Sequence, residues 1–352
     1  MPHEAVQSVL QRVFDAKTPL ANDVEFLLSL KSVEELEALY AFSQKVCEEF
    51  VGKGVLLRGI VEFSSYCKNT CHYCGLNRNN LNINRYRMNQ EEILKCVDHI
   101  YSKGVRTVVL QSGEDPAISA NEIAQTINQI IKKYDIAITL SCGERSKEDY
   151  KLWKDAGAQR YLLRIESTDE SLYNSLHDGM LLSNRLRCLR DLKDLGYQVG
   201  SGIMVGLKGQ TVKSIAKDII FFGEQNFDMI GIGPFISHSQ TPLANEPSGK
   251  AQDVLKVVAL TRIVTKNSHI PATTALGSLD RDYRIDALKI GANVIMPNFT
   301  QDEYKALYEI YPNKRCINEP AGACVNCNET MAKAAGKYID YSIGHSLKQK
   351  VF

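Results

Sequence analysis

The spacing of apolar residues changes once along the chain, near residue 50. Before that point apolar positions recur every three or four residues, as in EAVQSVLQRVFD, NDVEFLLSL and SVEELEALYAFSQKVCEEF. This spacing predicts amphipathic helices, because it places the apolar side chains on one face of each. Ser32 opens the last of these stretches and Glu35 follows three residues later, a capping-box pattern. We therefore expect an N-terminal helical segment over residues 1–50.

From residue 55 onward, short apolar runs rich in β-branched residues alternate with longer amphipathic stretches. The runs predict eight strands, over residues 55–63, 105–111, 136–142, 159–167, 197–207, 227–236, 270–275 and 292–298. The stretches between them predict helices over residues 91–104, 121–134, 147–157, 184–196, 212–226, 251–264 and 284–292. Several of these helices end at a glycine just before the next strand, as helix C-caps do: Gly104, Gly157 and Gly196.

This regular alternation favours one fold within the α/β class. Eight strands separated by helices predict a closed parallel (β/α)8 TIM barrel rather than an open doubly wound sheet. We expect the barrel to span residues 51–300, between the helical segment 1–50 and a C-terminal extension over residues 301–352 that carries a second group of cysteines. In such a barrel, chemistry belongs to the loops at the carboxyl ends of the strands.

Composition narrows the setting. The 42 Lys and Arg residues nearly balance the 41 Asp and Glu residues, so no overall field favours nucleic acid or a membrane surface. The amino terminus is charged and amphipathic rather than a signal peptide, and no apolar run is long enough to span a bilayer. Ten cysteines in a chain of this length, without a signal peptide, indicate a reducing cytoplasm in which clustered cysteines bind metal.

The first cysteine cluster directly follows the first predicted strand. In CKNTCHYCG, Cys67, Cys71 and Cys74 lie within eight consecutive residues, and the next cysteine is Cys96. A structural zinc site normally has four protein ligands, so a zinc reading needs a distant fourth residue. Three thiolates on a short loop instead suit a cubane 4Fe–4S cluster that leaves its fourth iron free for a small ligand.

This spacing, with Tyr73 just before the last cysteine, resembles the radical S-adenosylmethionine (SAM) superfamily. The resemblance implies that the free iron binds the amino and carboxylate groups of SAM, and that one electron cleaves the sulfonium to release a 5′-deoxyadenosyl radical. Residues at the ends of other predicted strands extend the resemblance to this superfamily. SGEDP resembles the motif that receives the methionyl amino group, and GIMVGL resembles the strip along adenine. Glu166 is placed like the ribose-binding carboxylate, and Arg185 like the guanidinium for the methionyl carboxylate.

Longer motifs resemble the HydE family of iron–iron hydrogenase maturases, in the biotin-synthase-like branch of that superfamily. They are VEFSSYCKNTCHYCGLNRNNLNINRYRM, VLQSGEDP, QRYLLRIES, MVGLKGQT, FDMIGIGPFISHSQTPLANE, IPATTALG and GANVIMPN. The resemblance covers residues from about 30 to 330, and GIGPFI-x-H-x-x-TPLANE and IPATT are its most specific parts.

What the family implies is a closed cavity with SAM near the cluster and the substrate deeper. The implied cofactor-binding residues are Tyr73, Ser112, Gly113, Glu114, Thr139, Arg164, Glu166, Arg185 and Met229, of which Thr139, Arg164 and Met229 also line the cavity. The implied catalytic residues in the cavity are Gln111, Arg160, Thr273, Thr274 and Tyr311. Two guanidiniums on one inward-tending strand, those of Arg160 and Arg164, would be costly to bury unless anions partner them.

The family also implies a reaction and its partners. The substrate would be a cysteine-bound iron with carbon monoxide and cyanide ligands, which HydG supplies. Radical attack at the cysteine sulfur would release an iron species for the two-iron subcluster of the hydrogenase. HydF is the further maturase, and a ferredoxin or flavodoxin would supply electrons. Packing in the barrel core remains an alternative for Thr139, Thr273 and Met229.

A second cysteine group, Cys316, Cys324 and Cys327, lies beyond the last predicted strand. Some members of the HydE family carry an accessory cluster with this spacing, and it is not regarded as essential to turnover. Three thiolates there could hold a 2Fe–2S cluster with one added ligand or a labile 4Fe–4S cluster. Zinc with a fourth ligand, or free surface thiols, are the other interpretations.

Two other functions stay open on the sequence alone. Methylornithine synthase shares the barrel and a similar RYR segment, and it rearranges the carbon skeleton of lysine. YCGLNRNN and IPATT favour the HydE family over it. A carrier that binds iron precursors without catalysis is the alternative outside enzymes, and the residues that resemble a SAM site argue against it.

Overall fold

The computed structural model describes residues 2–323 and 325–348. Its helices are α1 (Pro2–Asp15), α2 (Ala21–Leu28), α3 (Val33–Phe50), α4 (Gln90–Ser102), α5 (Ala120–Lys133), α6 (Lys147–Asp155), α7 (Glu170–Leu176), α8 (Leu182–Asp194), α9 (Val212–Glu224), α10 (Ala251–Thr265), α11 (Thr274–Gly277), α12 (Arg284–Ile290), α13 (Asp302–Lys305) and α14 (Val325–Ala334). Its strands are β1 (Gly54–Leu57), β2 (Gly59–Ser64), β3 (Thr107–Ser112), β4 (Ala137–Ser141), β5 (Arg160–Leu162), β6 (Gln198–Val205), β7 (Met229–Pro234), β8 (Val294–Ile295) and β9 (Tyr338–Asp340).

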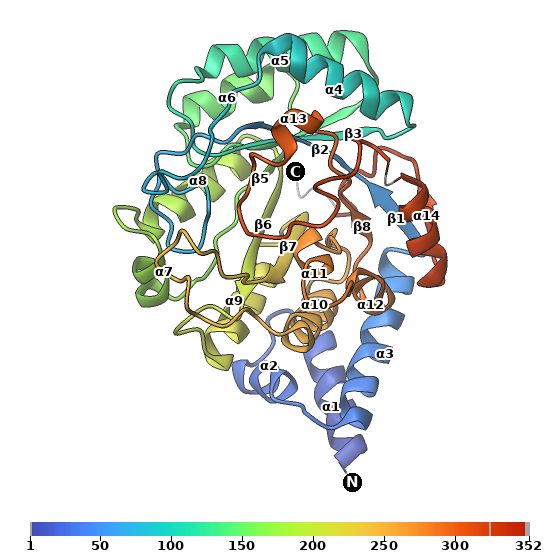
Figure 1. The fold of residues 1–352 in the computed structure, drawn as a ribbon. Helices are drawn as coiled ribbons and strands as arrows, with labels where there is room; N and C mark the ends of the chain where they lie inside the picture. Colours follow the sequence, from blue (N-terminus) through green and yellow to red (C-terminus); the bar gives the residue numbers. More distant parts are fainter. Residues whose placement is uncertain (1, 324, 349–352) are drawn as a thin grey trace.

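Parallel strands form the centre of the molecule, and helices surround them (Figure 1). One sheet runs in the order β2-β3-β4-β5-β6-β7, and a second in the order β8-β1-β9. Single bridges rather than a continuous ladder connect the two sheets: Met229 to His269, Pro271 to Val294 and Ile60 to Asn298. The arrangement is therefore the predicted α/β barrel, with one arc held by isolated contacts.

Several predicted strands differ from the structure. Those predicted over 159–167 and 292–298 are shorter, as β5 and β8, and two others differ in their course. The strand predicted over residues 55–63 is split at Arg58 into β1 and β2, because its first half pairs with β8 and its second half with β3. The strand predicted over 270–275 is wrong beyond Pro271. Thr273 is extended but caps the short helix α11, so only the start of the segment bridges its neighbours.

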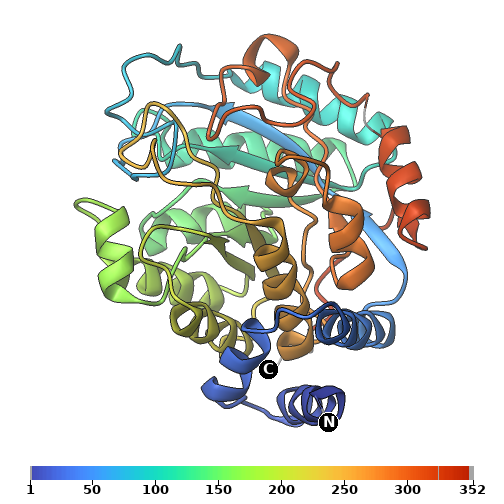
Figure 2. The same cartoon turned by 60° about the horizontal axis from the view of Figure 1, so that its bottom comes forward.

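The N-terminal helices pack outside the barrel, against α9, α10 and α12 (Figure 2). The predicted capping box is present: Ser32 accepts from the Glu35 amide at 3.3 Å, and the Glu35 carboxylate accepts from the Ser32 amide. The apolar faces of α1, α2 and α3 join the same continuous core as the helices of the barrel. These helices therefore support the barrel from outside and supply none of the predicted site residues.

Two C-terminal segments close the ends of the barrel. Residues 306–316, here called the covering segment, cross in front of the strands at their carboxyl ends (Figure 1). In this segment the Ile310 carbonyl accepts from the Gly75 amide at 3.0 Å, and the Arg315 amide donates to the Ser278 hydroxyl at 2.9 Å. Residues 341–348, here called the C-terminal strap, follow β9 and run across the amino-terminal ends of the strands.

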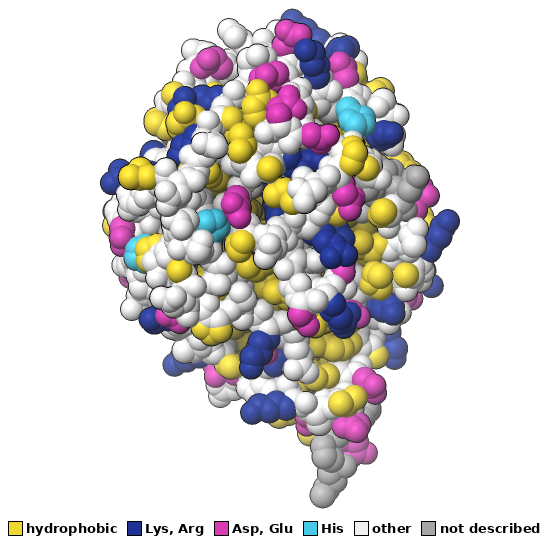
Figure 3. All heavy atoms as spheres, in the orientation of Figure 1, with side chains coloured by type: hydrophobic (Ala, Val, Ile, Leu, Met, Phe, Trp, Pro, Cys, Tyr) yellow, Lys and Arg dark blue, Asp and Glu magenta, His cyan; other side chains and the backbone are white. Residues whose placement is uncertain are grey.

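Charged side chains of both signs are interspersed on the face shown in Figure 3, as the balanced composition predicts. Within the described residues, none of the helices combines the length and apolar character that crossing a lipid bilayer requires.

Candidate functional site

The cysteine loop follows β2 and lies at the carboxyl end of the barrel. Cys67, Cys71 and Cys74 are partly exposed and form no disulfide. Burial raises the pKa of all three thiols, and their mutual repulsion raises those of Cys71 and Cys74 further. The Cys74 amide donates to the Cys71 carbonyl at 3.3 Å, so the last two cysteines lie on one turn of the loop.

Arg85 holds this irregular loop in shape. Its guanidinium donates to the carbonyls of Ser65 at 2.7 Å, Leu76 at 3.1 Å and Asn77 at 2.8 Å. Buried loop carbonyls need such partners, and one planar guanidinium supplies several donors at once. Among the residues that the structure describes, no group of three His, Cys, Asp or Glu side chains is arranged around a single metal ion. A cubane needs a different arrangement, because each thiolate binds a different iron.

The SGEDP segment at the end of β3 packs directly against the cysteine loop. A side chain at Gly113 would lie 2.2 Å from the Tyr66 carbonyl and 2.9 Å from Cβ of Cys67, so only glycine fits there. The Glu114 carbonyl accepts from the Lys68 amide at 3.0 Å. The Glu114 side chain is buried and accepts from the Glu144 amide through Oε1, whereas its Oε2 lies 3.5 Å from Nζ of the half-exposed Lys68.

A network of two arginines and two glutamates lies after β5. Glu166 has a left-handed backbone with φ 61°, and its amide donates to the Gly202 carbonyl at 3.0 Å. Its Oε1 lies 2.9 Å from Nε of Arg164. Arg185, from α8, donates to Glu144 Oε1 at 2.6 Å and to the Arg164 carbonyl. Burial raises the pKa of Glu166, and the two arginines oppose that shift.

This network contains buried polar atoms without hydrogen-bond partners among the described residues: Arg164 Nη2, Glu166 Oε2 and Tyr173 Oη. Buried polar atoms are normally paired, so several unpaired ones at one place indicate a polar ligand. A small apolar cluster adjoins them, in which Tyr73 and Met204 pack against Leu172, Leu176, Leu207, Phe235 and Leu243. Tyr73 also bonds His177 Nε2 through its hydroxyl at 2.8 Å.

Most of the predicted cavity residues also lie inside the barrel. Gln111 donates to the Tyr308 hydroxyl at 3.4 Å, and Thr273 to the Ile232 carbonyl at 3.2 Å. Thr274 begins α11 beside Thr273, and Ser278 hydrogen-bonds to Tyr311. Deeper in the barrel, Thr139 and Met229 line a cavity of about 20 Å³ with Arg58 and His269. The Thr139 hydroxyl has no partner among the described residues.

Arg160 lies apart from these residues. It begins β5, at the amino-terminal end of the barrel, and all of its nitrogens are engaged. They donate to Gln198, to Thr107 and to the Ile343 and Gly344 carbonyls of the C-terminal strap. The chain itself thus occupies the position that we expected for a substrate anion. Arg164, four residues later, remains with the group at the carboxyl ends.

The second cysteine group is only partly described. Cys316 is partly buried at the end of the covering segment, and Cys327 is exposed in α14. Cys324 lies outside the described residues. The ligand set predicted for this group therefore stays a prediction.

The structure adds residues that sequence reasoning missed. Arg58 is fully buried inside the barrel and contacts the Met229 sulfur, while its Nε and Nη2 lack partners among the described residues. Glu144 binds Arg185, and Glu62 binds Lys314 from the covering segment. Arg58 and Glu62 were visible as single charges inside apolar runs, VLLRG and IVEFS. Glu144 and Lys314 gave no comparable signal.

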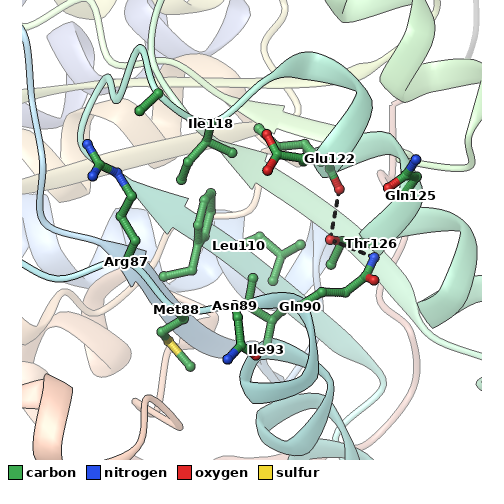
Figure 4. A pocket seen from close by; sticks show the side chains of 13 residues that line it. Arg87, Met88, Asn89, Gln90, Ile93, Leu110, Ile118, Glu122, Gln125 and Thr126 are labelled. Atoms are coloured by element: carbon green, nitrogen blue, oxygen red, sulfur yellow. Dashed lines mark hydrogen bonds between the residues drawn. The ribbon is translucent and has the colours of Figure 1, made fainter.

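A cavity of about 420 Å³ lies outside this site, between the first turns of α4 and α5 (Figure 4). Apolar side chains such as Ile93, Leu110 and Ile118 line it together with Arg87 and Glu122. None of the predicted site residues is among those that line it. Arg87 connects it to the site, since its guanidinium binds Asp115 at 2.6 Å and lies 3.6 Å from the ring centroid of Tyr66.

Comparisons with known proteins agree with this geometry. The sequence model of the Radical SAM superfamily matches residues 61–222, from β2 to α9. FeFe hydrogenase maturase subunit HydE of Thermotoga maritima is 47% identical over 86% of this chain and 86% of its own length. 3-Methylornithine synthase of Methanosarcina acetivorans is 30% identical over 82% of this chain and 83% of its own.

Solved structures show the same fold. The crystal structure of methylornithine synthase (PylB) has a TM-score of 0.80 and 26% identity, over 94% of this chain and 97% of its own. HydG, a maturase of the FeFe hydrogenase, has a TM-score of 0.79 over 97% of this chain and 76% of its own. Its 17% identity supports the shared fold alone.

A three-cysteine loop after the first barrel strand, an adjoining buried polar network and the superfamily match define a radical SAM enzyme. Within that class, the chain belongs to the family of the hydrogenase maturase HydE, because nearly half of its residues are identical over most of both chains.

Proposed function

We propose that this chain is a maturase that helps to assemble the two-iron subcluster of iron–iron hydrogenase. In this proposal it acts on a cysteine-bound iron that carries carbon monoxide and cyanide. The observation that carries the proposal is the 47% identity to HydE over 86% of each chain, against 30% to methylornithine synthase. The compartment that suits such chemistry is the reducing cytoplasm.

Cys67, Cys71 and Cys74 would hold the 4Fe–4S cluster, and the residues around them fit SAM by donor chemistry. Glu166 Oε2, which has no hydrogen-bond partner in the described chain, suits a ribose hydroxyl. Glu114 Oε2, which lies 3.5 Å from Nζ of the half-exposed Lys68, suits the methionyl ammonium. Arg185, fixed by Glu144, suits the methionyl carboxylate. The apolar cluster around Tyr73 and Met204 suits the adenine ring. When bound, the cluster supplies the electron that cleaves the sulfonium and releases a 5′-deoxyadenosyl radical.

The residues deeper in the barrel would hold the iron complex. Thr139, Thr273 and Thr274 offer hydroxyl donors, and Met229 offers apolar wall. Gln111, which bonds Tyr308 of the covering segment, and Tyr311, within the same segment, would complete the site. Arg58 takes the part that the sequence assigned to Arg160, because its unpartnered, fully buried nitrogens need an anion and those of Arg160 do not.

The chain's own residues would contribute orientation and exclusion of water. The covering segment closes the mouth above the site, and the C-terminal strap closes the opposite end. A radical reacts at one atom only when that atom is held in place, so small displacements should reduce turnover more than affinity. HydG and HydF are the proposed partners, and a ferredoxin or flavodoxin is the proposed electron donor.

The second cysteine group is proposed to hold an accessory iron–sulfur cluster that turnover does not need. Replacing Cys316, Cys324 and Cys327 together with serine should lower the iron content per chain while leaving SAM cleavage largely intact. Iron analysis and 5′-deoxyadenosine formation, measured on the same preparation, test this. Loss of cleavage in the folded triple variant would instead give this group a necessary part in electron transfer.

The decisive experiment incubates reduced, reconstituted protein with SAM and the HydG product. We expect 5′-deoxyadenosine, an adenosylated product and activation of a hydrogenase when HydF is added. A parallel incubation replaces the HydG product with L-lysine. Formation of methylornithine from lysine would show that the chain is a methylornithine synthase instead. Absence of SAM cleavage in both incubations would leave the non-catalytic carrier of iron precursors as the remaining function.

A further inference from the structure

A buried ion pair connects the barrel wall to the covering segment. Lys314, near the end of that segment, donates through Nζ to Oε1 of Glu62 on β2. The two side chains are 7% and 2% exposed, so neither charge is solvated. None of the functions assigned above uses either residue.

The pair faces the interior of the barrel, beside residues already placed in the site. In the ladder between β2 and β3, Glu62 is opposite Gln111, so the two side chains lie on the same face of the sheet. Gln111 in turn donates to the hydroxyl of Tyr308, and Nζ of Lys314 lies 5.3 Å from the centroid of the Tyr308 ring. The pair therefore stands at the barrel mouth, next to Gln111.

Stability alone does not explain two opposite charges at this place. Replacing a buried ion pair with apolar residues of similar volume is often neutral or stabilising, because burial removes both ions from water. A buried pair that remains therefore suggests a role beyond holding the segment down. The role depends on which hydrogen-bonding positions the pair leaves open.

Both members of the pair retain such positions. The Lys314 ammonium carries three N–H donors, and in the described chain it donates only to Glu62. The other Glu62 oxygen, Oε2, accepts from Nδ2 of Asn298 at 2.8 Å, and each carboxylate oxygen can accept a second bond. The pair thus offers a donor cation and an acceptor anion side by side.

We infer that Glu62 and Lys314 bind the charged groups of an α-amino acid, with Lys314 holding the carboxylate and Glu62 the ammonium. A bound amino acid would add its carboxylate beside Lys314 and its ammonium beside Glu62. Each of the four charged groups would then have neighbours of opposite charge. This inference rests on the proposed function, in which the substrate includes a cysteine. It adds the part of the site that recognises that cysteine.

The position agrees with this assignment. Burial raises the pKa of Tyr308, and the nearby charges of Glu62 and, more weakly, Cys74 raise it further. The covering segment, which carries Tyr308 and Lys314, also contacts the cysteine loop, because the Gly75 amide donates to the Ile310 carbonyl at 3.0 Å. An amino acid bound to the pair would place its side chain between the SAM site and the deeper barrel residues.

Three ligands test the contributions of the carboxylate and the ammonium one at a time. S-methyl-L-cysteine has both groups, 2-(methylthio)ethylamine lacks the carboxylate and 3-(methylthio)propionate lacks the ammonium. None has a free thiol that would attack the cluster. Their dissociation constants are measured by calorimetry on reconstituted full-length protein with SAM bound. We expect the wild type to prefer S-methyl-L-cysteine at least about tenfold over either truncated ligand.

The variants assign each preference to one residue. Lys314→Met should bind S-methyl-L-cysteine no better than the amine, and Glu62→Gln should bind it no better than the propionate. Lys305→Met is the matched control, since Lys305 is equally buried but binds Asp302 and the Glu319 carbonyl. It should keep both preferences. The double variant Glu62→Gln/Lys314→Met leaves no unpaired buried charge, and it should lose both preferences while remaining folded.

The inference is overturned if the wild type binds all three ligands equally, or if the folded double variant keeps its preference for S-methyl-L-cysteine. Because these binding measurements need no turnover, they are independent of the maturation assay. Failure to activate a hydrogenase would overturn the proposed function while leaving the amino-acid site in place.

Discussion

The two ends of the barrel are both closed by C-terminal segments, but their buried polar groups differ. At the carboxyl ends of the strands, Arg164, Glu166 and Tyr173 each retain an atom without a hydrogen-bond partner among the described residues. At the amino-terminal ends, every nitrogen of Arg160 is bonded, largely to the C-terminal strap. Since buried polar groups are nearly always paired, the unpaired atoms at the first end favour a ligand there, whereas the guanidinium of Arg160 is already satisfied by the chain.

The two ends differ in what supplies the hydrogen-bond partners of the buried polar groups, which at the amino-terminal ends is the strap itself. The strap brings its own carbonyls and hydroxyls: the Ser346 hydroxyl donates to Asp228, and the His345 carbonyl bonds Nε2 of His269. The covering segment brings side chains with donors to spare, such as Lys314. A buried arginine therefore does not by itself mark a binding site. Free hydrogen-bonding positions on the guanidinium do mark a binding site. Arg58 has such positions, whereas Arg160 has none among the described residues.

The largest effect is expected at the cysteine loop. Replacing Cys67, Cys71 or Cys74 with alanine should abolish the reducible 4Fe–4S signal and lower 5′-deoxyadenosine formation below detection, because each thiolate binds one iron. Electron paramagnetic resonance and product analysis measure the two effects. Cys96→Ala, which changes a buried cysteine of α4, is the control and should keep both. Persistent SAM cleavage in the triple variant would contradict the radical SAM assignment.

A smaller loss is expected from the network after β5. Arg185→Met should raise the dissociation constant for SAM by about 10- to 100-fold, because a charged hydrogen bond contributes roughly 1.5–3 kcal/mol. Arg187→Met on the same helix removes a more exposed guanidinium that pairs with Asp191, and it should bind SAM normally. Equal binding by wild type and Arg185→Met would remove this residue from the cofactor site.

The opposite result is expected at the amino-terminal end. Arg160→Met should lower the free energy of unfolding by roughly 2–4 kcal/mol, since it leaves buried carbonyls of the strap unpaired. SAM cleavage and product formation per folded molecule should stay within about twofold of the wild type. Denaturant unfolding and single-turnover assays on the same preparation test both statements. Normal stability with lost product formation would instead place a ligand at Arg160.

An effect on stability alone, and one that depends on pH, is expected at a buried carboxyl behind the site. Burial raises the pKa of Asp218 to about 7, although Thr168 donates to its Oδ1 from both amide and hydroxyl. A raised pKa favours the protonated form in the folded state, so its contribution to stability is complete below about pH 4 and is lost as pH rises through 7.

Asp218→Asn keeps an acceptor for Thr168 but cannot ionise. It should therefore unfold at higher denaturant concentration than the wild type at pH 8, and the two proteins should converge towards pH 5. The comparison uses urea midpoints over that range. Parallel pH profiles of the two proteins would show that Asp218 titrates normally.

Local patterns predicted much of this structure. The Ser32 capping box, the strand–helix alternation and the position of the cysteine loop each depend on residues close in sequence. The different surroundings of Arg160 and Arg164 have a physical cause. The two residues are four positions apart, so about 13 Å of extended chain separates them. Only the contacts of the strap, nearly two hundred residues away, show which of the two is already paired.

The site residues that the sequence did not predict were missed for the same reason, because their partners are distant in sequence. Glu144 reaches Arg185 from the loop after β4, and Lys314 reaches Glu62 from beyond the barrel. Each gains its position from a pairing of distant segments, which periodicity cannot reveal. Family resemblance brought the cofactor residues together, but it did not include these supporting groups.

The order in which the strands can pair has a consequence for folding during translation. β1 has no partner until β8 and β9 have emerged, and the covering segment and the strap come from the same late part of the chain. During translation the barrel interior therefore stays open at both ends until these late segments have been made. Such long-range pairing also folds slowly. The cysteine loop of the nascent protein thus stays accessible until the covering segment and the strap have packed.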